Sequence, residues 1–134
     1  MSIEAAISDL QAKALALSGM RTAPATPLES SDIFPFAITF EESGTLELRS
    51  SGFAHDLATL VTEIHCARNS LPQAITQAMT FRDNFLKAII GDPRLSNSVD
   101  TALVVRRKFG AMRYAETDTI GYRFEVDVKV QLTT

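Results

Sequence analysis

The sequence predicts an α+β protein with two helices on one face of a mostly antiparallel or mixed five-stranded sheet, in the order α-β-β-β-α-β-β. Apolar residues recur at helical spacing in two segments, one near the N-terminus and one in the middle of the chain. Other segments alternate apolar and polar residues, which is typical of strands. The predicted strands come in runs rather than one by one between helices, and this order indicates an α+β arrangement.

Size and charge limit the possible functions. The 134 residues favour one domain, residues 1–134. A formal net charge of −3 disfavours nucleic acid or an anionic membrane as the main ligand, because both need a basic face. The single cysteine forms no internal disulfide. No segment has the apolar length of a membrane span, and Glu4 and Asp9 stand where a signal peptide would be positive. We expect a soluble protein made in a reducing compartment.

The first predicted helix covers Ser2–Ser18. Its apolar residues are spaced by three and four, which places them on one side of the helix. Gly19 is a typical helix end. Prolines and small polar residues then predict a long loop over Gly19–Ile33, and loops of this length are commonly functional or disordered. The apolar positions of the helix are Ile3, Ile7, Leu10, Ala14 and Leu17.

Three strands are expected next. Phe36–Glu41 alternates apolar and polar residues, and Glu42-Ser43-Gly44 is typical of a turn. A short second strand, Leu46–Arg49, would then form a hairpin with the first. After Ser50-Ser51-Gly52, a third strand runs over Asp56–Ala67. Neither of its faces is fully polar, which indicates a strand inside the sheet.

The second predicted helix covers Leu71–Ile90. Ser70 can cap its N-terminus, Gln73 can return the hydrogen bond, and Pro72 occupies the first turn, where no amide donor is needed. Apolar residues at helical spacing continue to Ile90, and Gly91-Asp92-Pro93 then ends the helix. A helix of this length matches the sheet that it would cover.

The chain ends in two predicted strands. Tyr122–Val130 has the cleanest alternation in the sequence, with one apolar face and one face of mixed charge. The preceding strand, Ala102–Ala115, carries apolar residues in two parities, and a bulge at Gly110 would bring both to one face. Thr117-Asp118-Thr119 is the expected connecting turn.

The sequence carries no enzyme signature. His65 and Cys66 are neighbours on a strand and so point to opposite faces, and no further metal ligands accompany them. His55-Asp56 has no nucleophile motif, and Gly91-Asp92-Pro93 lacks the lysine of a phosphate-binding loop. We therefore expect no catalytic residues, no metal site and no cofactor. A sheet histidine beside a buried thiol is the favoured interpretation.

Charged side chains on the last two strands are the candidate functional residues. Arg106-Arg107-Lys108 is the only basic run, and it is either an interface or anion-contacting patch or a solvated strand end. The mixed-charge face of the last strand suits either solvent or contact between identical subunits, where opposite charges pair. The candidate assembly residues are Arg106, Arg107, Arg113, Arg123, Glu125, Asp127 and Lys129.

The element order resembles that of the tail terminator proteins of long-tailed bacteriophages and of the related tail-completion proteins of phage-like gene transfer agents. The likeness covers nearly the whole chain and rests on pattern and length. The features that carry it are the helix Ser2–Ser18, the Phe34-Pro35-Phe36 start of the first strand, the helix Leu71–Ile90 and the strand Tyr122–Val130.

This resemblance implies a structural virion protein, made in the host bacterial cytoplasm and located in the tail. Such proteins form a hexameric ring on the tail tube, end tube polymerisation and join the tail to head-completion proteins. DNA would pass through the lumen without specific binding, and no membrane is involved. The loop Gly19–Ile33 and the hairpin around Ser43-Gly44 would project toward neighbours or the tube.

Two alternatives remain open at this point. One is another head–tail adaptor or minor tail protein, which would attach to a twelvefold portal or a tail tip. The other is a small dimeric ligand-binding α+β domain with an apolar pocket between its helices and its sheet.

Overall fold

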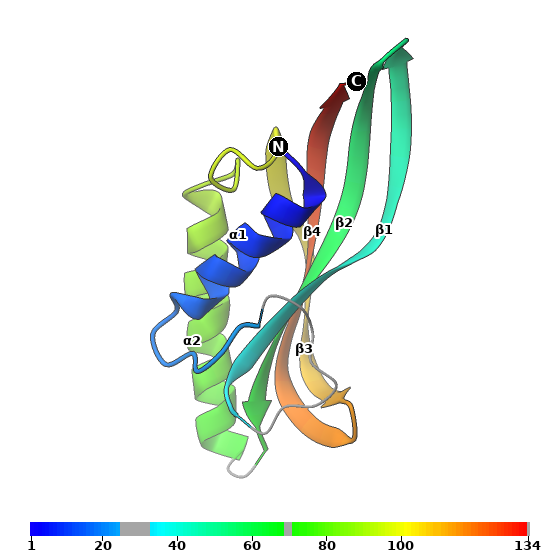
Figure 1. Cartoon of the computed structure of the whole chain (residues 1–134). Helices are drawn as coiled ribbons and strands as arrows, with labels where there is room; N and C mark the ends of the chain where they lie inside the picture. Colours follow the sequence, from blue (N-terminus) through cyan, green and yellow to red (C-terminus); the bar gives the residue numbers. More distant parts are fainter. Residues whose placement is uncertain (25–32, 69–70, 134) are drawn as a thin grey trace.

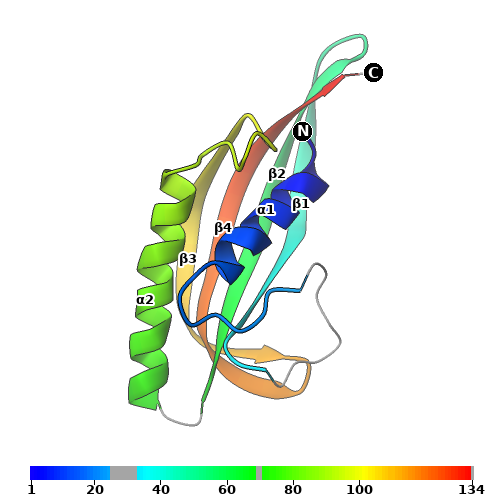
Figure 2. The same cartoon turned by 60° about the vertical axis from the view of Figure 1, so that its left-hand side comes forward.

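The computed structural model describes residues 1–24, 33–68 and 71–133. The four strands form one antiparallel sheet in the order β1-β2-β4-β3. Both helices pack on the same side of this sheet (Figures 1 and 2), which we call the helix face; the opposite side is the helix-free face. The elements are α1 (Ile3–Leu15), β1 (Phe36–Ser50), β2 (Phe53–Ala67), α2 (Leu71–Ile90), β3 (Thr101–Tyr114) and β4 (Thr117–Thr133).

The expected five-stranded sheet is wrong, because the first two predicted strands form one continuous strand. β1 pairs with β2 along its whole length. Glu42 is the extra residue of a bulge, and Gly44 lies opposite Ala58 rather than in a turn. A side chain at Gly44 would come 3.0 Å from the carbonyl oxygen of Leu57, so this glycine permits a close approach of two strands. The expected projecting hairpin around Ser43-Gly44 is therefore also wrong.

The bulge predicted at Gly110 is wrong as well. Gly110 lies opposite Gly121 in regular register, and the shift in register falls at Val105. Since the bulge comes earlier than expected, the apolar residues of β3 divide between the two faces. Phe109 lies on the helix face, and Met112 lies on the helix-free face above Gly121.

The turn between β3 and β4 consists of Ala115 and Glu116. The expected turn at Thr117-Asp118-Thr119 is wrong, because these residues begin β4 and pair with the end of β3. Ala115 has a φ of 54°, the left-handed conformation that short hairpin turns use.

Both predicted helices are present. α1 is shorter at its C-terminal end than the expected Ser2–Ser18, and the hydroxyl of Ser2 caps it by accepting a 3.0 Å hydrogen bond from the amide of Ala5. The expected bounds of α2, Leu71–Ile90, are confirmed. Its expected cap, Ser70, lies outside the described residues.

An ion pair joins α1 to the segment that follows α2. Lys13 Nζ donates to a carboxylate oxygen of Asp9 at 2.7 Å and to one of Asp92 at 2.8 Å. The hydrogen bond from Lys13 lowers the pKa of Asp92. This link is therefore present above the ordinary carboxyl pKa and weakens as the pH falls through the lowered value.

The core lies between the helices and the sheet. Phe81 and Phe85 of α2 are buried against the apolar face of β4, and the rings of Phe85 and Phe124 lie 5.0 Å apart. Burying side chains of this size contributes about 1.5–3 kcal/mol each. These groups fill space where the ligand-binding alternative expects a pocket.

One part of the sheet projects beyond the helices. The tip of the β1–β2 hairpin and the end of β4 extend past the N-terminus of α1 (Figures 1 and 2). We call this part the arm, and it consists of Leu46–Ser50 of β1, Phe53–Asp56 of β2 and Gln131–Thr133 of β4, which pair with one another.

Candidate assembly surfaces

The basic run lies in the middle of β3, an edge strand of the sheet. Arg106 is opposite Glu125 and Arg107 is opposite Phe124, so the two arginines lie on the helix-free face and the helix face, respectively. Lys108 shares the face of Arg106. All three are exposed. The β3 edge therefore presents positive charge on both faces of the sheet.

Arg123 lies at the centre of an ion-pair network on the helix-free face. Its guanidinium lies 3.3 Å from a carboxylate oxygen of Glu125 and 3.7 Å from one of Glu63, and it also pairs with Glu42. These carboxylates come from β4, β2 and β1. Arg106 joins the network at 3.9 Å from Glu125. Arg123 and Glu125, both predicted assembly residues, thus connect strands within one subunit.

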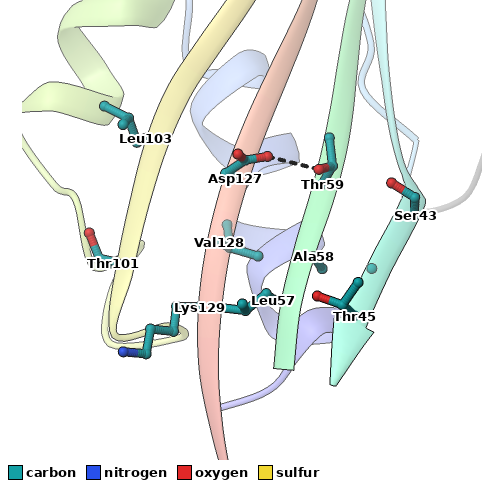
Figure 3. Close-up of a pocket in the computed structure, with 11 residues that line it drawn as sticks. Ser43, Thr45, Leu57, Ala58, Thr59, Thr101, Leu103, Asp127, Val128 and Lys129 are labelled. Carbon is teal, nitrogen blue, oxygen red and sulfur yellow. Dashed lines mark hydrogen bonds between the residues drawn. The ribbon is translucent and has the colours of Figure 1, made fainter. Parts of the chain in front are cut away.

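Asp127 and Lys129 line a trough of about 560 Å³ on the helix-free face (Figure 3). The hydroxyl of Thr59 donates to a carboxylate oxygen of Asp127 at 2.8 Å. Leu57 and Leu103 add apolar surface to the same trough. The trough thus combines one carboxylate, one ammonium group and apolar side chains on the side of the sheet that faces away from the core.

The predicted assembly residues therefore divide into separate groups. Arg106, Arg123 and Glu125 are joined in the network, and Asp127 and Lys129 lie at the trough. Arg107 and Arg113 lie on the helix face of β3; Arg113 is exposed, with its Nε 4.0 Å from a carboxylate oxygen of Asp118.

Sequence reasoning missed two surfaces. The first is apolar: Leu46, Leu48 and Leu132 on the arm are 62%, 75% and 41% exposed, respectively. The second is the acidic pair Glu41 and Glu42, which lies on an exposed part of edge strand β1 and not in a turn. The alternation of Leu46 and Leu48 was visible in the sequence, but it does not show which side lacks a covering helix.

A hydrogen-bonded trio connects β2 and β4 near the start of β1. His65 Nδ1 lies 2.6 Å from the hydroxyl of Thr119, and its Nε2 lies 3.0 Å from a carboxylate oxygen of Glu63. The ring of Phe36 stacks on the imidazole at 4.8 Å. A hydroxyl, an imidazole and a carboxylate in series have the order of a catalytic triad. Here the hydroxyl and the imidazole are fully buried, so the trio serves as a link between strands.

Cys66 is buried on the opposite side of β2 from His65, as expected from strand geometry. Burial raises the pKa of its thiol to about 11. At pH 8, only about one thiol in a thousand is then the reactive thiolate. Among the described residues, no cluster of metal-ligating side chains is present.

We expect Cys66 to be unreactive in the native protein. At pH 8, a disulfide reagent such as Ellman's reagent should label native protein far more slowly than protein unfolded in guanidinium chloride, which should react with one equivalent. The reaction of native protein should accelerate only as the pH approaches the raised pKa. Full labelling of native protein within seconds at pH 8 would contradict the burial of this thiol.

No protein-family model matches the chain, and no curated protein matches its sequence significantly. None of the described helices combines the length and the apolar character needed to cross a bilayer.

Proposed function

We propose that this protein is a tail terminator of a long-tailed bacteriophage or a phage-like gene transfer agent. In this role it forms a ring, expected to be hexameric, on the end of the tail tube. The ring ends tube polymerisation and presents its other side to the head-completion proteins. The net charge of −3 is compatible with DNA passing through the lumen without being bound.

The observation that supports an assembly role best is the apolar arm. Leu48 lies in register with Ala54 and Leu132 on the helix face, and Leu46 lies two residues from Leu48 on the same side. The arm extends beyond α1, and these leucines are largely exposed. Contiguous apolar side chains on a projecting hairpin are typical of a surface that another subunit covers. We assign the tail tube as the partner of the arm.

Replacing one arm leucine should separate folding from assembly. In Leu48→Lys the ammonium group reaches water in the free subunit, so the free energy of unfolding should change by about 0.5 kcal/mol or less. On the tail tube it would be buried without a partner, so capping should weaken at least about tenfold. Capping is measured as the length of tubes grown from the tube protein of the same genome, with electron microscopy of their ends.

Leu71→Lys is the matched control, because Leu71 is an exposed leucine at the start of α2, away from the arm. It should cap tubes as the wild type does. Wild-type protein that leaves tube length unchanged would contradict the proposed function. Binding to a portal or a tail tip instead would favour an adaptor, and a stable dimer that binds a small ligand would favour a ligand-binding domain.

A further inference from the structure

The sheet has two open edges. β1 is exposed along Glu41–Ser50, and no other described strand pairs with this part of it; the bridge between Thr22 and Phe36 lies nearer its start. β3 is likewise unpaired on its outer side among the described residues from Leu103 to Arg113. An exposed edge offers unpaired amides and carbonyls to a strand of another chain.

The two edges carry opposite charge. β3 presents its basic run and Arg113, together with exposed apolar side chains such as Val105. β1 presents Glu41, Glu42 and Glu47, with Arg49 as its one basic residue. Two β3 edges side by side would place arginines against arginines, which disfavours a symmetric pair. A β3 edge beside a β1 edge brings opposite charges together.

The directions of the strands also fit. In the order β1-β2-β4-β3, with every neighbouring pair antiparallel, β1 and β3 run in opposite directions. A β1 strand placed beside the β3 of another copy therefore continues the antiparallel alternation without reversal. Such a contact uses two different surfaces of each subunit, so it gives a ring where the rotation between copies closes and an open filament where it does not, rather than a two-fold dimer.

The register brings particular charges together. Glu41 and Val104 lie on the same row across the sheet, through Leu60 and Val126. Arg107 lies on the helix face, as Glu41 does. It pairs with Phe124, so its row is two residues along β4 from the row that holds Glu41 and Val104. A shift of two rows between neighbouring copies places Arg107 directly opposite Glu41, and it sets the open segment Leu103–Arg107 of one copy beside the open segment Glu41–Thr45 of the next. Among the described residues, neither has an ion pair within its own subunit.

We propose that copies of this chain associate by pairing the β3 edge of one subunit with the β1 edge of the next, with Arg107 facing Glu41 across the contact. The sheet then continues from subunit to subunit and closes into a ring. This inference specifies the contact within the proposed terminator ring, and it rests on ring formation but not on what the ring caps.

A charge exchange tests the contact. Arg107→Glu and Glu41→Arg each place like charges across it, so each variant should associate at least about tenfold more weakly than the wild type. The double variant, Arg107→Glu with Glu41→Arg, should recover association. An equimolar mixture of the two single variants should also associate, with the two chains in equal numbers. Native mass spectrometry and light scattering from micromolar to millimolar protein measure all four samples.

Leu71→Lys again serves as a control, and circular dichroism verifies that each variant is folded. A wild-type chain that stays monomeric up to millimolar concentration would overturn the proposal. So would single variants that associate like the wild type. If only Arg107→Glu has an effect and the double variant is not rescued, two β3 edges pair with each other and the proposal is wrong. A ring that forms and responds as expected but leaves tail tubes uncapped contradicts the terminator function alone.

Discussion

Gly121→Ala should be among the most destabilising single substitutions in this protein. Gly121 lies opposite His65 in the pairing of β2 and β4. A Cβ atom at this position would overlap the carbonyl oxygen of Ile64 and lie 3.0 Å from its carbonyl carbon. Both are backbone atoms in the middle of the sheet, so the two central strands would have to separate. We expect a loss of about 3 kcal/mol or more in the free energy of unfolding, measured by urea denaturation.

Gly110→Ala is the matched control for this prediction. Gly110 is paired with Gly121 across β3 and β4, yet a Cβ atom at Gly110 would meet nothing within 4 Å. The same substitution at the neighbouring position should therefore change the free energy of unfolding by about 0.5 kcal/mol or less. Equal stability of the two variants would contradict the close approach of β2 and β4 at Gly121.

Val126→Asp should abolish folding or nearly so. Val126 is fully buried on the helix face of β4, in register with Leu60 and Val104. The new carboxylate would have no partner in this apolar core, and an unpaired buried charge costs about 3–5 kcal/mol. That is comparable to the whole free energy of unfolding of a small domain. The soluble fraction after expression and the circular dichroism of any soluble protein provide the measurement.

The same substitution at an exposed valine shows whether burial is the cause. Val105 lies in the bulge of β3 and is 49% exposed, so Val105→Asp should give soluble and folded protein. Val126→Asp that is soluble and natively folded would mean that the face assigned to β4 is wrong. The contrast between the two variants separates core packing from a general intolerance of added charge.

Local sequence patterns were sufficient to predict some elements, because these elements are formed by interactions between residues close together in the chain. The bounds of α2 follow from its apolar spacing and from the glycine and proline after Ile90. The buried face of β4 follows from strict alternation, since adjacent side chains on a strand point to opposite sides. The burial of Cys66 followed in the same way.

Other elements depend on partners far away in the sequence. Glu42-Ser43-Gly44 has turn-like composition, but β2 is long enough to pair with residues on both sides of it, and the bulge absorbs the extra residue. Gly110 likewise has the composition of a bulge, whereas the register with β4 places the shift at Val105. In both cases, long-range strand pairing outweighed the local preference.

The candidate surfaces likewise divide into properties that the sequence predicts and properties that depend on the tertiary structure. The sequence alone determined that a basic run lies on a strand of an α+β protein with an acidic balance of charge. Only the tertiary structure decided that Arg123 is paired within the subunit, that Arg107 lies on one open edge and that Glu41 lies on the other. Charge is a property of single residues, but whether a charged side chain meets a partner or solvent depends on strand order and register, which are set by contacts between distant segments.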